Sequence, residues 1–193
     1  MTLKLNKLRR TRKMKIRGLF VYCMVAVIVA MTLNAAPVHG VVAVSTDDLV
    51  MASDVILRGV VEQTKSVWDQ KAGTIITRAL LKVTQVIRGN ISAKSVAFEY
   101  EGGTVGDLTL QLRDVVSVVK GEDVIVFLKT KADKVNESVF LVHGDKQGKY
   151  TVKDGIVTKE IDYIEGDPAI IDNNIPISTL IKKIRGVKKH DKT

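Results

Sequence analysis

Cysteine is almost absent from this chain of 193 residues, and its single copy, Cys23, lies in an apolar run near the beginning. The rest of the chain therefore forms no intramolecular disulfide, and the stability of its folded part must come from a packed core. About 150 residues bury roughly 68–70% of their unfolded surface, which is enough for a core without cross-links. We therefore expect one domain, or one domain with appendages, held together by packing.

Histidine is also scarce, and the motifs of metal sites are missing. Of the three histidines only His143 lies inside the predicted domain, and neither an HExxH motif nor paired cysteines occur. The sequence therefore predicts no metal and no cofactor. Asp145 follows His143 two positions later, which is a weak acid–base pattern, but no partnered nucleophile accompanies the pair. We interpret His143 as a surface histidine at a strand end and predict no catalytic residues.

Acidic residues are absent from residues 1–39, and this absence explains the high net charge of the chain. Of the 30 Lys and Arg residues, eight lie in this leader, which leaves 22 against 21 acidic residues in residues 40–193. The formal net charge of +9 thus belongs to the leader, and the body is close to neutral. A near-neutral body gives no support to phosphate-backbone binding, so we do not expect nucleic acid as a partner.

An uncharged apolar run, residues 19–33, follows the basic segment directly. A basic region, an apolar region and small residues after it are typical of an export signal, so we interpret residues 1–40 as a signal peptide. The alternative is an uncleaved signal anchor, because residues 19–38 are long enough to span a bilayer although Asn34 interrupts them. Small residues suitable for cleavage stand at Ala35, Ala36, Gly40 and Ala43. In both cases the basic flank stays inside, so we expect an exported body, either extracellular or held at the cell surface.

Alternating apolar and polar residues dominate the body, and this period of two predicts β-strands. The expected strands are residues 54–63, 74–88, 95–100, 108–113, 123–129, 138–143, 149–153 and 156–159. Gly59 and a phase slip near Gln85 predict bulges or bends. Many short, closely connected strands favour a barrel or a sandwich. Because long bent strands favour closure, we predict a small antiparallel oligonucleotide/oligosaccharide-binding-type (OB) barrel, with a β-sandwich as the alternative.

Two short helices are expected beside these strands. Thr46, which two acids follow, is a suitable N-cap for a helix over residues 46–53. Ser178 is the N-cap candidate of a C-terminal amphipathic helix, which Gly186 interrupts or ends. The predicted parts of the chain are a leader at residues 1–40, a barrel domain with its leading helix at residues 41–159, and C-terminal loops, helix and tail at residues 160–193.

The stretch from Val96 to Lys131 carries the clearest strand pattern. Its alternation predicts core faces at Val96, Phe98 and Tyr100, at Leu108, Leu110 and Leu112, and at Val124, Val126 and Leu128, with Ile125 and Phe127 on the opposite face of the last strand. Apolar residues on both faces predict a central strand. The glycines of this stretch lack the GK[ST] end of a phosphate-binding loop and are interpreted as turn or bulge residues: Gly102, Gly103, Gly106 and Gly121.

Trp68, beside a predicted turn at residues 70–73, is the best candidate for a surface contact. We expect partners to dock on an edge strand, or on loops near Trp68 and near Gly102, Gly103 and Gly106. His143 and Asp145 complete the binding candidates. Glu99 and Glu101 share one strand face, and we interpret them as part of a solvated face rather than as a glycosidase pair.

Several loops are rich in oxygen ligands. They contain Asp167, Asp172, Asn173 and Asn174, and Asp133, Asn136 and Glu137. Neither loop has the spacing of a calcium-binding EF-hand, and turns select Asp and Asn for their own geometry. Asn90 and Asn136 begin sequons for N-glycosylation, which is relevant to an exported chain.

Three pieces of the chain, Val86–Gly89, Gly102–Gly106 and Gly121–Leu128, together resemble an uncharacterised family of exported prokaryotic β-barrel domains. That family has a strand ending in V-K-G, a GG-x-x-G turn and a G-E-x-V-x-x-F-L strand. More distantly, the order of elements is similar to the netrin-like OB-type module of tissue inhibitors of metalloproteinases. That module inhibits through a disulfide-anchored N-terminal cysteine that chelates zinc, and this chain has no such cysteine. The resemblance therefore implies a fold and a compartment, but no activity.

The function that these observations favour is a non-enzymatic binding or scaffolding module, exported to the cell surface, with a protein or another envelope component as its partner. The alternative is an extracellular hydrolase or a hydrolase inhibitor that uses His143, Asp145 or the pair Glu99 and Glu101. Binding of single-stranded nucleic acid through an OB-type surface is a weaker third hypothesis for a near-neutral exported domain.

Overall fold

The computed structural model describes residues 41–131, 139–160 and 164–188. The predictions for the leader, for Asn136 and for the loop of Asp133 and Glu137 lie outside these residues. Within the described part, no helix has both the length and the apolar character needed to cross a membrane.

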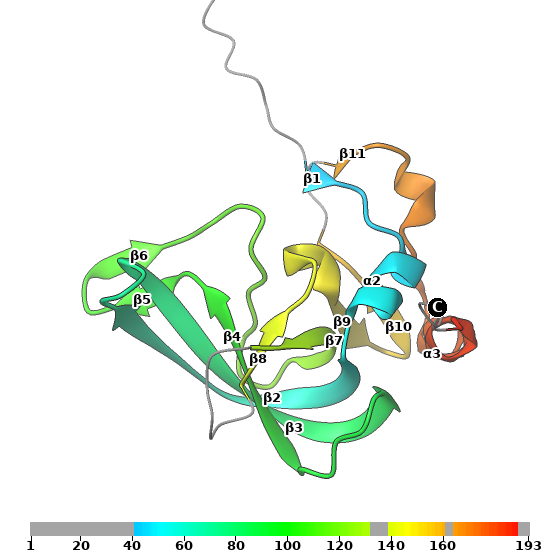
Figure 1. The fold of residues 1–193 in the computed structure, drawn as a ribbon, viewed down its shortest axis with the longest axis horizontal. Coiled ribbons are helices and arrows are strands. Elements are labelled where there is room, and N and C mark those ends of the chain that lie inside the picture. The colour runs from blue at the N-terminus through cyan, green and yellow to red at the C-terminus, as the bar shows by residue number, and fades with distance from the viewer. Residues whose placement is uncertain (1–40, 132–138, 161–163, 189–193) are drawn as a thin grey trace, which may run out of the picture. The chain divides into compact units, whose positions relative to one another are not determined.

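The described residues form a mainly β structure with one short helix before the strands and one after them (Figure 1). The strands are β1 (Val41–Val42), β2 (Val55–Asp69), β3 (Thr74–Arg88), β4 (Ser95–Glu101), β5 (Gly103–Val105), β6 (Leu108–Leu110), β7 (Asp123–Thr130), β8 (Val139–Val142), β9 (Lys149–Lys153), β10 (Ile156–Thr158), β11 (Ile164–Glu165) and β12 (Ile175–Pro176). The helices are α2 (Thr46–Ala52) and α3 (Ile177–Gly186), with short 3-10 turns η1 (Asp145–Gly148) and η2 (Pro168–Ile170). The expected β class and both expected helices are confirmed.

Eight strands form one mixed sheet in the order β12-β10-β9-β7-β2-β3-β4-β8. Among the described residues, the strands of this sheet pair antiparallel except β4 with β8, which pair parallel. Strand β8 also pairs with β7, so the pairings β7-β2-β3-β4-β8 return to β7 and form a partial ring. Two smaller two-stranded sheets, β1 with β11 and β5 with β6, complete the β structure.

Strand β7 is central, as its apolar residues on both faces predict. Val124, Val126 and Leu128 are fully buried in one core cluster, which also contains Phe98 from β4 and Phe140 from β8. The alternate residues of β7, Ile125 and Phe127, are fully buried in a second cluster. Because successive side chains of a strand point to opposite faces, one strand contributes to both cores.

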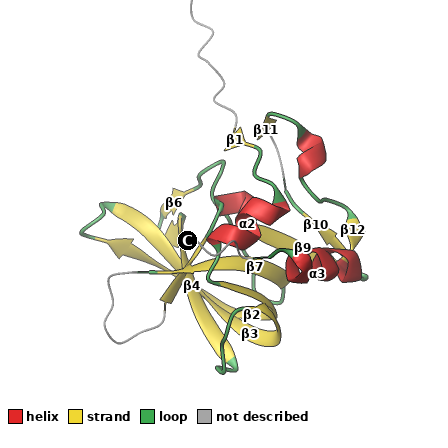
Figure 2. Cartoon of the chain, turned by 45° about the vertical axis from the view of Figure 1, so that its right-hand side comes forward, coloured by secondary structure: helices red, strands yellow, loops and turns green. Residues whose placement is uncertain are grey.

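The second core lies between the sheet and the two helices. Leu49 of α2 and Leu180 and Ile184 of α3 have no exposed surface and pack in the same cluster as Phe127 and Tyr150. Figure 2 shows both helices on the same side of the sheet, near β7, β9 and β10. Burial of this apolar stripe explains why a helix as short as α3 is formed, since isolated helices of this length are marginal in water.

Both predicted helix N-caps are wrong by one or two positions. Ser45, not Thr46, caps α2, because its hydroxyl accepts the Asp48 N–H at 3.1 Å. Thr46 is instead buried in the first turn. Helix α3 begins at Ile177 after Pro176, without a capping side chain, so Ser178 lies inside its first turn. The prediction that α3 ends at Gly186 is confirmed.

The β2–β3 hairpin is longer than the pattern of β2 predicts. Strand β3 has the expected bounds, but β2 continues to Asp69 instead of ending at Gln63. Strand pairing with β3 carries β2 through polar residues that would not indicate a strand by themselves. The bulges expected near Gln85 and Gly59 are confirmed by register shifts along this pair, and a Cβ at Gly59 would collide with the carbonyl oxygen of Lys82.

The prediction of a core strand over residues 108–113 is wrong. Strand β6 covers only Leu108–Leu110, pairs only with β5, and leaves Leu108 65% exposed. Leucines at alternate positions indicate a strand but not the sheet that it joins. Figure 1 places this small hairpin beside the far end of the β2–β3 hairpin.

Candidate functional site

A groove of about 680 Å³ lies along the outer face of β2, β3, β4 and β8, and we call it the outer groove. Its floor is apolar: Val67, Ile76, Leu80, Ala97 and Val139. These residues alternate along their strands with core residues such as Ala79, Leu81 and Phe98, so they point away from the inner core. Three charged side chains, Lys65, Arg78 and Glu99, also line the groove.

Glu99 lies at the centre of this charged group and binds two cations. Arg78 donates to its Oε1 from Nε at 3.1 Å and from Nη2 at 2.8 Å, and Lys131 donates from Nζ to its Oε2 at 2.7 Å. Burial by itself would raise the pKa of Glu99, but the hydrogen bonds and charges of Lys131 and Arg78 outweigh burial and hold this pKa below its ordinary value. The carboxylate is therefore held in its ionised form.

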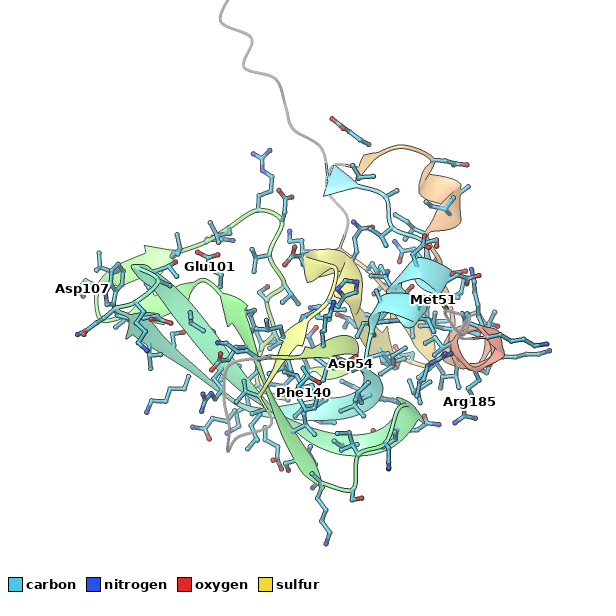
Figure 3. The ribbon with its side chains drawn as sticks, viewed as in Figure 1. Met51, Asp54, Glu101, Asp107, Phe140 and Arg185 are labelled. Carbon is cyan, nitrogen blue, oxygen red and sulfur yellow. The ribbon has the colours of Figure 1, made fainter. Side chains whose placement is uncertain are left out.

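The prediction that Glu99 and Glu101 share a solvated face is wrong for Glu99. Its side chain is only 8% exposed, because Arg78 and Lys131 cover it. Glu101 is exposed as expected and accepts the Thr74 hydroxyl at 2.7 Å. Figure 3 shows Glu101 near the beginning of β5, and Asp107 at the outer end of the β5–β6 hairpin. The two glutamates thus have different roles although they stand two residues apart.

Lys65 faces the groove from β2, directly opposite Arg78 of β3. Lys65 is exposed, and among the described residues its ammonium has no ion-pair or hydrogen-bond partner. Lys65 and Arg78 thus line the groove, and Arg78 and Lys131 bind the carboxylate of Glu99. Asp69, which lines the neighbouring hollow, also interacts with the charge of Lys131. The result is a local excess of positive charge in a body that is nearly neutral.

Trp68 stands at the rim of this site. A neighbouring hollow of about 480 Å³ is lined by Trp68, Lys71 and Lys131. It shares Arg78 and Glu99 with the outer groove. The Trp68 side chain is 51% exposed, which agrees with its interpretation as a surface aromatic. A half-exposed indole beside fixed cations offers a flat apolar surface to a ligand.

The glycines of the central stretch have structural roles. Gly102 donates its N–H to the Ile75 carbonyl oxygen at 2.7 Å, and its own carbonyl oxygen accepts the Thr77 hydroxyl at 2.6 Å. Gly103 has φ of +122°, and a Cβ there would collide with the hydroxyls of Ser66 and Thr77. Gly106, with φ of +57°, turns the chain between β5 and β6 in open space. Gly102 and Gly103 also border a hollow of about 260 Å³ that is separate from the outer groove.

His143 and Asp145 lie after β8, outside the outer groove. Within the described residues no hydrogen bond joins their side chains. Burial lowers the pKa of His143, with Lys129 acting in the same direction, whereas burial raises the pKa of Asp145. The structure therefore does not bring the binding candidates together. Trp68 lines the hollow beside the outer groove, Gly102 and Gly103 border another hollow, and His143 and Asp145 line none of these.

The oxygen-rich loop near α3 uses its side chains internally. Asn173 accepts the Lys159 N–H at 2.8 Å, and Asp172 accepts the Lys183 ammonium at 2.7 Å. Asp167 accepts the Ala169 N–H at 2.8 Å. No group of three or more His, Cys, Asp or Glu residues in the described part could hold a metal ion. Asn90, the other predicted sequon, is exposed just after β3.

Lys159 is an unusual buried residue that sequence reasoning missed. Its side chain is 94% buried, and its ammonium lies 4.3 Å from the centroid of the Tyr150 ring. Burial lowers the pKa of Lys159 to about 7, although the charge of Asp172 acts in the opposite direction. Tyr150 in turn shares a hydrogen bond of 3.1 Å with Thr46.

The charged group of the outer groove was also missed, although one signal was present in the sequence. If the turn at residues 70–73 closes a tight hairpin, Asp69 pairs with Thr74, and the same register places Lys65 opposite Arg78. No local sequence pattern predicts the register that places Glu99 of β4 opposite Arg78, or the position of Lys131 beside Glu99. Comparison with models of known protein families and comparison with curated proteins both gave no match, so the fold and the groove carry the functional argument.

Proposed function

We propose that this chain is an exported, non-enzymatic binding module that receives its partner at the outer groove, at the cell surface. The single observation that carries the proposal is the groove itself, with an apolar floor and a fixed excess of cations beside an exposed tryptophan. Binding sites are usually concave and mostly apolar, with a few well-placed polar groups that orient the ligand.

The connectivity of the ring supports a finer interpretation, a small OB-type barrel. Strands β2, β3 and β4 follow one another antiparallel, β8 runs parallel to β4, and β7 joins β8 to β2. OB-type barrels bind their ligands on the face of their second and third strands, between two flanking loops. In this assignment those strands are β3 and β4, which form the middle of the outer groove.

The chemistry of the groove suits binding rather than acid catalysis. A general acid must deliver a proton, and Glu99 is held as a carboxylate by Arg78 and Lys131. Glu99 instead fixes the Arg78 guanidinium and the Lys131 ammonium in place before a ligand arrives. Preorganised groups of this kind reduce the entropy that is lost on binding.

The test compares the chemical accessibility of the groove in two settings. Intact cells that export the full chain, and the same chain purified, are treated with an amine-reactive reagent, and labelling is quantified by mass spectrometry. Lys65 and Lys153 are both exposed lysines, and Lys153 lies on β9, away from the groove. We expect Lys65 to be protected at least fivefold in cells and Lys153 to react equally in both settings. Equal labelling of Lys65 in both settings would contradict the proposal.

A further inference from the structure

The outer half of β2, residues 63–69, has one free strand edge. Strand β7 pairs with β2 only from Val55 to Val60, and the last backbone contacts on that side are those of Val61 with Gly121 and Glu122. From residue 63 to residue 69 the strand pairs only with β3, and no other backbone partner occurs among the described residues. The segment contains no proline, so its N–H and C=O groups on this side match another extended strand.

The charges of this free edge are balanced. Lys65 and Asp69 are the two charged residues of the segment 63–69, and Glu62 lies just before it in the bulge, where it accepts the Ser95 hydroxyl at 3.4 Å. The net charge therefore favours neither an acidic nor a basic partner. The positions of the charges are more informative. Lys65, Val67 and Asp69 alternate along β2, so all three side chains lie on the same face of the sheet.

A second copy of the same edge is complementary to this pattern. If two copies pair antiparallel about a two-fold axis at Val67, this valine faces its own counterpart, and Lys65 of each copy faces Asp69 of the other. Side chains directly opposite one another in a sheet are close enough to interact, so two ion pairs flank the two valines. Trp68, 51% exposed, then faces Ser66 of the other copy, and the two indoles are diagonal neighbours.

The two charged groups are available for this contact. Oδ1 of Asp69 accepts the N–H of Lys71 at 2.9 Å and that of Ala72 at 3.2 Å. These two bonds, with a smaller effect of Lys131, hold the pKa of Asp69 below its ordinary value, so the carboxylate is charged. Its Oδ2 has no hydrogen-bond partner among the described residues. Lys65 is exposed and likewise lacks a partner there, and a second copy supplies the missing counter-charge.

The lysine also restricts the register of such a pairing. A register that places Lys65 opposite its own counterpart brings two like charges together, which destabilises a strand pair. A register that places Lys65 opposite Glu62 matches opposite charges, but it moves the second strand over Val61, whose backbone already bonds Gly121 and Glu122. Only residues 62–65 could then pair. The register about Val67 matches both charges and uses backbone that is free.

We propose that two copies of this chain associate edge to edge through residues 65–69 of β2, antiparallel about Val67, with Lys65 of each copy paired to Asp69 of the other. Backbone hydrogen bonds and the contact of the valines supply affinity, and the two ion pairs set the register. Because the paired segment is short, the association depends on protein concentration. The inference goes beyond the proposed function, and the outer groove of each copy does not require it.

Cross-linking of the full chain in detergent tests the register. Cys23→Ser removes the single cysteine, and Val67→Cys in this background places one thiol at the two-fold axis. Opposite residues of antiparallel strands have Cα atoms about 4.5–5.5 Å apart, which suits a disulfide. Thr64→Cys on the same edge is the matched control, because its thiol would lie about 20 Å from its counterpart. Under mild oxidation we expect Val67→Cys to form covalent dimers at least tenfold faster.

An exchange of charges tests the ion pairs. Trp68 is the only tryptophan of the chain, so its fluorescence on dilution reports association. Lys65→Glu places two acids opposite each other, Asp69→Lys places two lysines opposite each other, and each variant alone should associate at least tenfold more weakly. An equimolar mixture of the two restores both opposite-charge pairs and should recover the affinity of the unmodified chain to within threefold. Lys153→Glu, at an exposed site on β9, should leave affinity within twofold.

The mixture also controls for folding. Asp69→Lys removes an acceptor of the turn, and circular dichroism verifies that each variant is folded; a variant that had lost its fold would not recover on mixing. Asp69→Asn keeps a side-chain acceptor for the turn and removes the charge, so it should weaken association less than Asp69→Lys.

Three results would overturn this inference: an unmodified chain that stays monomeric over a thousandfold range of concentration, a mixture no tighter than its components, or equal cross-linking through Thr64→Cys and Val67→Cys. Association also shields Lys65, so the purified chain is labelled both as a monomer and as a dimer. Protection of Lys65 in cells beyond that of the purified dimer then belongs to a partner of the outer groove, which keeps the two proposals separate.

Discussion

The ammonium of Lys159 lies over the ring of Tyr150, 4.3 Å from its centroid. Among the described residues it is the only buried side-chain nitrogen or oxygen without a hydrogen-bond partner. A cation over an aromatic ring gains some attraction, but less than the hydration that burial removes. Burial of the Lys159 ammonium over Tyr150 therefore lowers the stability of the folded state.

Replacing Lys159 by methionine should stabilise the protein near pH 7. The pKa of Lys159 is about 7 in the folded state and 10.5 when unperturbed, so at pH 7 folding must remove much of its charge or bury it. We expect Lys159→Met to raise the free energy of unfolding by roughly 3 kcal/mol at pH 7, measured by urea unfolding followed by circular dichroism. Lys153→Met, at an exposed site, is the control and should change little.

The stability of the unmodified protein should also rise with pH between about 7 and 9. In this range the unfolded state keeps a proton on Lys159 that the folded state releases, so the unfolded state binds more protons and higher pH favours folding. Lys159→Met should remove most of this slope. A difference between the two proteins that stays constant from pH 7 to pH 9 would contradict the assignment.

Glu99→Gln should destabilise the protein at neutral pH by roughly 1–2 kcal/mol, since Arg78 and Lys131 are partly exposed and lose only part of their interaction. The pKa of Glu99 is lowered in the folded state, so the stability that its charge contributes is present above pH 4.5 and is lost as pH falls through the lowered value. Unfolding at pH 7 and near pH 3 measures the difference between the two proteins. We expect this difference to shrink in acid.

Gly103→Ala and Gly106→Ala form a matched pair on the β5–β6 hairpin. Both glycines have positive φ, but only at Gly103 would a Cβ also collide with Ser66 and Thr77. We expect a loss of roughly 2 kcal/mol or more for Gly103→Ala and about 1 kcal/mol for Gly106→Ala, measured by thermal unfolding. Equal losses would mean that the hairpin does not pack against β2 and β3 at this point.

Gln147→Ala should release the segment that precedes α2. The Gln147 side chain accepts the Val44 N–H at 2.8 Å and donates to the Val42 carbonyl oxygen at 2.9 Å, so one buried amide binds both groups of this extended segment. We expect hydrogen exchange at the Val44 amide to accelerate at least tenfold, while exchange at Phe127 in β7 changes much less. Unchanged protection of Val44 would show that the pairing of β1 with β11 holds the segment alone.

Local patterns were sufficient for much of the β structure. The bounds of β3 and β9 agree with their predictions, because the flanking turns and the alternation are both properties of neighbouring residues. The apolar residues on both faces of β7 correctly indicated a strand between two cores. Turn glycines such as Gly106 and Gly121, both with positive φ, were equally readable.

The errors arose where a residue's environment depends on distant strands. Nothing near Glu99 in the sequence indicates that Arg78 and Lys131, 21 and 32 positions away, will cover it. The leucines of β6 alternate like core residues, yet the hairpin pairs outside the main sheet. Strand β2 continues past Gln63 because β3 pairs with it, although its own residues are polar.

The sequence by itself determined where most of the long strands and their turns lie and which strand is central, because steric preferences and side-chain alternation act over a few residues. Tertiary structure alone decided that β8 joins β4 and β7, that Glu99 is buried between two cations, and that Lys159 lies over Tyr150. Each of these depends on register between segments that are far apart in the chain. The outer groove belongs to this second class, because it exists only after the ring of strands has formed.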